Sequence, residues 1–87
     1  MLNKAKKDGI IQKFKTHATD TGSPQVQIAI LSAEIEELSG HLKEHKKDHS
    51  SRRGLLKKVG ERHRLLRYLE REDAQGFANL AEKLKLK

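Results

Sequence analysis

The chain has 87 residues and no cysteine, and only 34% of its residues are hydrophobic and 3% aromatic. A chain this short buries about 60–70% of the surface that its unfolded form exposes, so we expect one domain over residues 1–87, a thin core, and no deep substrate pocket, disulfide or thiolate metal site. Nineteen Lys and Arg against twelve Asp and Glu give a net charge of +7, which favours a polyanionic partner, nucleic acid first and an anionic membrane surface second.

The first predicted helix covers residues 4–15 and is weakly anchored. Gly9 lowers its helix propensity, and a polar link over residues 16–22 separates it from the next element. The apolar residues available to dock it are Ile10, Ile11 and Phe14. We therefore expect this helix to open more easily than the rest of the fold.

Two long helices are predicted next, over residues 24–44 and 51–72. Ser23 offers an N-cap hydroxyl and Pro24 a suitable first helical residue. The apolar positions of the first long helix step by three and four residues: Ile28, Leu31, Ile35, Leu38 and Leu42. Three residues offer N-caps for the second: Asp48, Ser50 and Ser51. Its apolar seam contains Leu55, Val59, Leu66 and Leu69, flanked by Leu56 and Leu65.

A short last helix is predicted over residues 74–84, with Asp73 as its N-cap. Its apolar residues are Phe77, Leu80, Ala81 and Leu84. No segment alternates in the manner of a β-strand. The predicted fold class is therefore all-α with four helices, in which two long antiparallel helices form a hairpin and two short helices flank it.

The positive charge is concentrated in residues 41–71, where eleven Lys and Arg stand against four acids. At 100° per residue, one face of the helix over 51–72, opposite to its apolar seam, gathers a set that we call the basic stripe. Its members are Arg53, Lys57, Gly60, Arg64, Arg67, Tyr68 and Arg71. Such a stripe suits phosphate contacts, with Gly60 admitting a close backbone and Tyr68 offering a ring. A solvated face that keeps a small domain soluble has the same composition.

The loop over residues 44–53 has two interpretations that the sequence alone leaves open. At an ordinary helix junction, Lys43 and Lys46 complement a helix C-terminus, and Asp48 or Ser50 caps the next helix. A carboxylate and a hydroxyl among cations also suit the recognition of base edges and 2′-hydroxyls, while the cations hold phosphates.

Histidines at i, i+4 and i+8 raise the question of a metal site, because paired histidines on a helix can bind zinc. No Glu directly follows His41, no cysteine exists, and His49 is expected beyond the helix end. A catalytic set of Ser51, His49 and Asp48 is also disfavoured, because neighbours in sequence rarely converge on one point. We therefore expect no metal, no other cofactor, no catalytic residue and no enzymatic activity.

The remaining polar candidates fall at the two ends of the predicted hairpin. The first set, the Gln27 end, contains Thr21, Gly22, Gln27 and Tyr68. The second, the His41 end, contains His41, Asp48 and Ser51. Fourteen residues separate Gln27 from His41, about 21 Å along a helix. A rod with two contact points is suited to bridging separate parts of a folded RNA.

Two segments of the chain resemble the bacterial family of small-subunit ribosomal protein fifteen. They are TGSPQVQIAIL at 21–31 and GHLKEHKKDHSSRRGLLKKVGERHRLLRYL at 40–69, which ERED follows. The resemblance covers essentially the whole chain. It implies four helices, primary binding to the central domain of small-subunit ribosomal RNA, and nucleation of the platform for later proteins. It also implies an intersubunit bridge with large-subunit ribosomal RNA, a cytoplasmic location in the ribosome, and a monomer when free.

The same resemblance assigns three groups of site residues. A three-way RNA junction would be contacted by Thr21, Gly22, Gln27 and Tyr68, with Arg64 and Arg71 beside them. A minor-groove G·U/G·C site would be recognised by His41, Asp48 and Ser51. Phosphates would be contacted by His45, Lys46, Lys47, Arg52, Arg53 and Lys57. This sequence departs from the family at two positions. Ser50 stands where the family usually has a second histidine, so a contact made by a histidine at position 50 is not expected to transfer. Gln25 stands where the family often has an acid, which is a smaller departure.

Two other classes of protein share these electrostatics. A helical DNA-binding module needs a recognition helix set across a second helix by a short turn, whereas the cations here run the full length of one helix. A basic amphipathic helix at a membrane surface usually has Trp and Phe, and this chain has no Trp and two Phe.

The longest apolar run is Ile28–Leu31, and residues 1–15 lack the features of a signal or transit peptide. We therefore expect no membrane span and a protein that stays in the cytosol.

Overall fold

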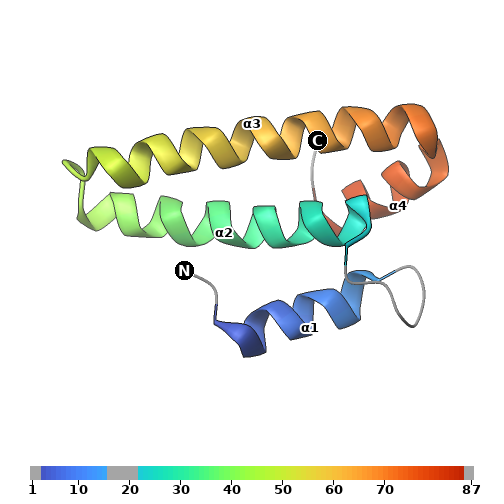
Figure 1. The fold of residues 1–87 in the computed structure, drawn as a ribbon, viewed down its shortest axis with the longest axis horizontal. Coiled ribbons are helices and arrows are strands. Elements are labelled where there is room, and N and C mark those ends of the chain that lie inside the picture. Colours follow the sequence, from blue (N-terminus) through green and yellow to red (C-terminus); the bar gives the residue numbers. More distant parts are fainter. Residues whose placement is uncertain (1–2, 16–21, 86–87) are drawn as a thin grey trace.

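The computed structural model describes residues 3–15 and 22–85, so Thr21 lies outside the described residues. Four helices follow one another along the chain (Figure 1). They are α1 (Lys4–Phe14), α2 (Pro24–Glu44), α3 (His49–Glu72) and α4 (Ala74–Leu84). No strand occurs in these described ranges, and the predicted all-α class is confirmed.

The starts of α2 and α3 follow from side-chain caps. The hydroxyl of Ser23 accepts a hydrogen bond from the backbone N–H of Val26 at 3.3 Å. The carboxylate of Asp48 accepts one from the backbone N–H of Ser51 at 3.1 Å. Because Asp48 is the cap, α3 begins at His49, slightly earlier than the sequence predicted.

Asp73 serves the end of α3 and the start of α4. Its backbone N–H donates to the carbonyl of Leu69 at 2.7 Å, and its carboxylate accepts from the N–H of Gly76 at 3.0 Å. A Cβ at position 76 would collide with the Asp73 carboxylate, so glycine is the residue that fits beneath this cap. The turn between α3 and α4 is therefore fixed by one aspartate and one glycine.

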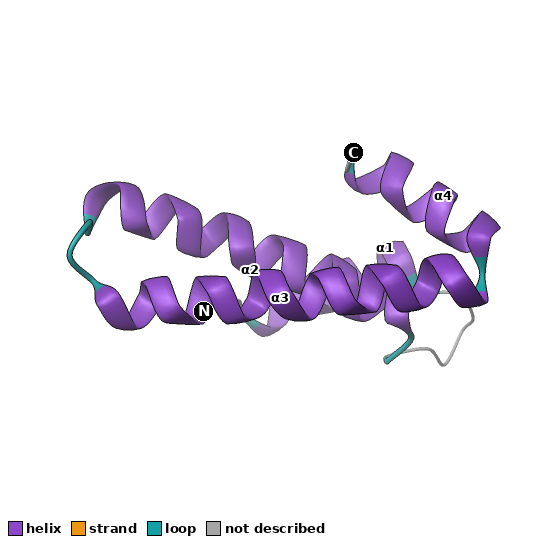
Figure 2. Ribbon diagram, turned by 90° about the horizontal axis from the view of Figure 1, so that it is seen from above, coloured by secondary structure: helices purple, strands orange, loops and turns teal. Residues whose placement is uncertain are grey.

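The predicted antiparallel hairpin is confirmed. In Figure 1 α2 and α3 lie side by side and α1 packs along α2, and both views show α4 turning back from the end of α3 (Figures 1 and 2). The molecule measures 40 × 28 × 18 Å. None of the described helices is both long and apolar enough to cross a membrane.

The core is concentrated at one end of the hairpin. Val26 and Ile28 of α2 are fully buried there, where all four helices meet. The other buried members of this cluster are Phe14, Ala29, Leu69 and Leu80. Each of the larger side chains among them, Ala29 excepted, contributes about 1.5–3 kcal/mol through its burial. The loop end, in contrast, consists of α2 and α3 alone and projects from the core as a two-helix rod (Figure 1).

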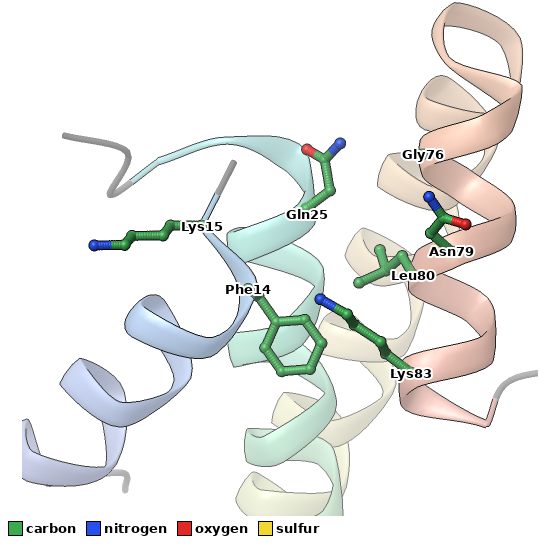
Figure 3. Close-up of a pocket in the computed structure, with 7 residues that line it drawn as sticks. All are labelled: Phe14, Lys15, Gln25, Gly76, Asn79, Leu80 and Lys83. Carbon is green, nitrogen blue, oxygen red and sulfur yellow. The ribbon is translucent and has the colours of Figure 1, made fainter. Parts of the chain in front are cut away.

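Phe14 is the buried anchor of α1, and the partly buried Ile10 and Ile11 pack beside it against the core. Phe14 is 9% exposed, and the ammonium groups of Lys13 and Lys83 lie 5.7 and 5.6 Å from its ring centroid. Figure 3 shows Lys83 of α4 reaching toward the ring beside Leu80. A hollow of about 170 Å3 surrounds this contact, and no residue of the basic stripe lines it. The hollow therefore belongs to the docking of α1.

The middle of the hairpin corrects the predicted apolar seam of α3. Val59 and Leu56 are 38% and 66% exposed, although the sequence placed Val59 in the seam and Leu56 beside it. The positions that face α2 there are occupied by Lys58 and Arg62. The Lys58 ammonium lies 3.3 Å from the Glu34 carboxylate, and Arg62 donates to the hydroxyl of Ser32 at 3.3 Å. Lys58 and Arg62 can occupy these positions because their long aliphatic stems cover apolar surface while their charged ends find partners.

Candidate nucleic-acid interface

Every residue of the basic stripe is exposed on α3. Within the described part of the chain, Arg71 is its one member in an ion pair, a surface contact of 3.7 Å with Glu72. Among the described residues no acid forms an ion pair with the other cations of the stripe, so their charge stays available for an external anion. The stripe therefore has the surface position and the charge that phosphate contacts require.

At the Gln27 end the fold brings together residues far apart in sequence. Gln27 of α2 and Tyr68 of α3 line one groove of about 420 Å3, as the antiparallel arrangement predicted. The amide nitrogen of Gln27 donates to the carbonyl of Gly22 at 2.6 Å, which ties the entry of α2 to this groove. The other residues that line the groove are Glu61, Arg64 and Leu65.

Tyr68 stands between two grooves. With Arg64 it also lines a second groove of about 490 Å3, whose other residues are Arg67, Glu70 and Arg71. The ring of Tyr68 is 46% exposed, and the Arg71 guanidinium lies 5.9 Å from its centroid, within cation–π range. A ring that is exposed at this point can stack against a base, and the arginines beside it can bind the adjoining phosphate.

At the His41 end three side chains form one hydrogen-bonded network. The Oδ2 atom of Asp48 lies 2.8 Å from Nε2 of His41 and 2.7 Å from the hydroxyl of Ser51. These contacts hold the pKa of the Asp48 carboxyl well below its ordinary value, first through the bond from His41 and then through the backbone and hydroxyl bonds from Ser51. The aspartate is therefore ionised at neutral pH and can only accept, so His41 Nε2 and the Ser51 hydroxyl both donate to it.

This network determines what the loop can offer a ligand. Three of the roughly four acceptor positions of the Asp48 carboxylate are used within the chain. The Ser51 hydroxyl directs its hydrogen to Asp48, so toward a ligand its oxygen presents lone pairs and acts as an acceptor. His41 is stacked on His45, with ring centroids 4.5 Å apart. Asp48 therefore caps α3. The acceptors that stay open to a ligand are the hydroxyl oxygen of Ser51 and one remaining acceptor position of the Asp48 carboxylate.

Two arginines organise the rest of the loop. Arg52 donates to the carbonyl of Lys46 at 2.7 Å and closes the turn, and Arg53 donates to the hydroxyl of Ser50 at 3.3 Å. Ser50 thus has a partner on its own helix. The residues predicted to contact phosphates here are all exposed: His45, Lys46, Lys47, Arg52, Arg53 and Lys57. Among the described residues, no group of three or more His, Cys, Asp or Glu side chains is placed to hold a metal ion.

Glu61 belongs to the Gln27–Tyr68 groove but was not among the residues predicted from the sequence. A signal was present, because Glu61 precedes Tyr68 by seven residues, two turns of a helix, and so lies on the same side of α3. Glu34 of α2 is turned toward Lys58 of α3, with a side chain 13% exposed, and so belongs to the packing of the hairpin.

An all-α fold with an exposed cationic helix face and ordered polar clusters at both ends of one hairpin is typical of helical RNA-binding proteins. The sequence matches the profile of the family described as Ribosomal protein S15 over residues 6–87. It is 58% identical over 87 residues to the small ribosomal subunit protein uS15 of Thermoanaerobacter sp. (strain X514), which covers 100% of this chain and 99% of that protein.

Two further relatives carry the same description. The chain is 55% identical over 86 residues to the protein of Halalkalibacterium halodurans, covering 99% of this chain and 97% of the relative. It is 54% identical over 83 residues to that of Staphylococcus carnosus, covering 95% and 93%. The chain therefore belongs to the ribosomal protein S15 family, as the sequence resemblance indicated. It is a ribosomal protein of the small subunit, located in cytoplasmic ribosomes, and not an enzyme.

Proposed function

We propose that the chain is a single RNA-binding domain that binds the central domain of small-subunit ribosomal RNA directly and bridges RNA helices at a three-way junction. By holding these helices together it nucleates the platform, to which other platform proteins then add. The observation that supports this most is the placement of the Gln27–Tyr68 groove and the His41–Asp48–Ser51 network at opposite ends of one hairpin, with the basic stripe exposed along α3.

The His41 end recognises a minor groove at a G·U/G·C step. Guanine presents its amino group as the one hydrogen-bond donor among the base edges of that groove, and the wide minor groove of RNA admits side chains. The acceptors for that amino group are the hydroxyl oxygen of Ser51 and the remaining acceptor position of Asp48. His41 holds the Asp48 carboxylate in place from α2.

The Gln27 end contacts the junction itself. Nucleotides at a junction are unstacked more easily than those in a duplex, and Tyr68 offers an exposed ring for one of them. Arg64 and Arg71 flank that ring and hold the neighbouring phosphates. Gln27 and Gly22 complete the contact, together with Thr21 from outside the described residues.

Along the rod between these ends, contacts with the sugar–phosphate backbone fix the register of the protein on the RNA without reading sequence. The residues that make them are His45, Lys46, Lys47, Arg52, Arg53 and Lys57.

In the assembled ribosome the chain also contributes to an intersubunit bridge with large-subunit ribosomal RNA. This part of the proposal is supported by membership of the family rather than by a particular surface. It is tested by comparing the association of small subunits reconstituted with and without the protein: weaker association in its absence is expected, and equal association contradicts it.

Chemical footprinting on intact small-subunit ribosomal RNA tests the proposed binding site. We expect protection of two separate helical elements that meet at one three-way junction in the central domain. Protection confined to a single continuous helix, or located in another domain of the RNA, would contradict the proposal.

A further inference from the structure

The groove at the Gln27 end contains an acid that phosphate binding does not explain. Glu61 lines it together with Gln27, Arg64, Leu65 and Tyr68, and its side chain is partly buried. Among the described residues no cation lies within 4.0 Å of its carboxylate and no hydrogen-bond donor is paired with it. Because Glu61 is the one acid in a groove surrounded by the basic stripe, it lowers the affinity of this groove for phosphate.

The lining of the groove instead suits a nucleobase. Leu65 supplies apolar surface, and Tyr68 supplies a half-exposed aromatic ring. The Gln27 amide donates one of its two N–H groups to the carbonyl of Gly22, which orients the amide and leaves its oxygen as an acceptor. Glu61 adds two further acceptor atoms. The groove therefore combines a stacking surface with a cluster of acceptors, and the matching ligand is a base edge rich in donors.

We propose that Glu61 makes this groove a guanine-selective subsite within the junction contact, which rests on the proposed RNA-binding function. Guanine is the base whose Watson–Crick edge presents two adjacent donors, N1–H and the N2 amino group, and these match the two oxygens of one carboxylate. Adenine and cytosine present one amino donor beside a ring nitrogen lone pair that repels the carboxylate. Uracil presents a single N–H between two carbonyl oxygens.

The neighbouring residues then have separate roles in this subsite. Tyr68 stacks against the guanine ring, the oxygen of the Gln27 amide accepts from the N2 amino group, and Arg64 binds the phosphate of the same nucleotide. Glu61 thus supplies base selectivity at the Gln27 end, as Ser51 and Asp48 do at the His41 end. The bridge would be specified by bases at both of its ends.

Inosine substitution tests this subsite without any change in the protein, because inosine lacks only the N2 amino group of guanine. Each unpaired guanine of a three-way-junction RNA is replaced in turn, and the affinity of the wild-type chain is measured at fixed salt. We expect one position at which inosine weakens binding about tenfold, the effect of losing a good base contact. Equal affinity for every inosine-substituted RNA overturns the proposal.

The protein variant Glu61→Gln then assigns the effect to the carboxylate. It keeps the shape of the side chain but replaces one acceptor by a donor that opposes the guanine donors, so the inosine penalty at that position should shrink to the part that the Gln27 oxygen supplies. Glu70→Gln is the matched control, because Glu70 lines the groove on the other side of Tyr68 and should retain the penalty. If Glu61→Gln binds every RNA more tightly with an unchanged inosine profile, Glu61 only repels phosphate and the proposal fails.

The failure of this subsite is distinguishable from the failure of the proposed function. A wild-type chain that binds an intact junction no better than one isolated helix contradicts the bridging function, whatever Glu61 does. A chain that prefers the junction but shows the same inosine profile with and without the Glu61 carboxylate contradicts the guanine subsite alone. The melting temperature of each variant, followed by circular dichroism, separates loss of selectivity from loss of folding.

Discussion

Nε2 of His41 and Oδ2 of Asp48 lie 2.8 Å apart, so the end of α2 is joined directly to the residue that caps α3. The contact closes the loop across seven residues and fixes which groups in the loop donate and which accept. Asp48 therefore has two functions at once: it starts a helix, and it orders the acceptors that we propose recognise the RNA minor groove.

Replacing Asp48 separates these two functions. Asp48→Ala should bind the specific junction about tenfold more weakly with an unchanged salt slope. It should also unfold more easily, because it loses the cap of α3. Asp48→Asn should lose less binding, because it keeps the shape and one acceptor. Titrations against specific and unrelated RNA, with melting curves in parallel, make the comparison. Normal junction binding by Asp48→Ala, or equal weakening on both RNAs, would mean that Asp48 is only a cap.

The same aspartate predicts how stability depends on acidity. Its pKa is depressed in the folded chain below the ordinary value of 3.8, because His41 and Ser51 donate to its ionised form. The unfolded chain therefore takes up this proton at a higher pH, so the contribution of Asp48 is complete above about pH 4 and declines as the pH falls further. In urea unfolding, the stability difference between wild type and Asp48→Asn should shrink below pH 4. An identical difference at pH 7 and pH 3 would refute this assignment.

Lys57 tests the role of the basic stripe. Lys57→Gln should weaken binding to specific and unrelated RNA alike and reduce the slope of log K against log salt by about one. Lys6→Gln is the control, because Lys6 is an exposed cation on α1 outside the stripe. A Lys57 variant that changes selectivity but not the salt slope would show that this lysine contacts a base rather than a phosphate.

The Glu34–Lys58 pair predicts how the middle of the hairpin is stabilised. Its side chains are 13% and 24% exposed, so Glu34→Ala, which leaves the Lys58 charge poorly solvated, should cost about 1–3 kcal/mol in the free energy of unfolding. Glu36→Ala, an exposed acid on the same helix, should cost much less. Replacing both partners, with Glu34→Leu and Lys58→Met, should recover most of the loss. Equal effects of the two single alanine variants in urea unfolding would show that the ion pair contributes nothing.

The docking of α1 should be the weakest part of the described fold. Helix α1 buries only Phe14 and packs along α2, whereas α2 has five buried residues and pairs with α3 along the hairpin, so we expect weak hydrogen-exchange protection of residues 5–14 relative to Leu31 of α2 and Leu66 of α3. Phe14→Ala should lower that protection further while leaving the hairpin unchanged. Protection of α1 equal to that of the hairpin would contradict this order of stability.

Local signals in the sequence predicted most of the fold. Ser23 and Pro24 located the start of α2, and Asp73 located the start of α4, because caps depend on neighbouring residues alone. The apolar pattern was wrong in placing Val59 in the buried seam. A hydrophobicity pattern does not reveal that Lys58 and Arg62 can face another helix when that helix places Glu34 and Ser32 opposite them. Such pairings depend on the register of two helices, which only the folded hairpin defines.

The candidate site was predictable to a similar degree. The pairing of Gln27 with Tyr68 follows from an antiparallel hairpin, as does the proximity of His41 to Ser51. The sequence left open whether Asp48 caps or recognises, because that depends on how many of its acceptor positions the chain itself uses. Glu61 was missed because the stripe was defined by positive charge, and an acid at its edge becomes relevant only when a groove is seen there.

The central claim is that the two ends of the hairpin engage two RNA elements at once, and a titration of four complexes tests it most directly. Two proteins are compared: the wild-type chain and Ser51→Ala, which changes the His41 end alone. Each is titrated against an intact three-way junction and against the isolated RNA helix that carries the G·U/G·C step. The account predicts that the wild type binds the junction much more tightly than the isolated helix, and that Ser51→Ala weakens both complexes by a similar factor. Equal affinity of the wild type for junction and isolated helix would show that the Gln27 end contributes nothing, and would contradict the account.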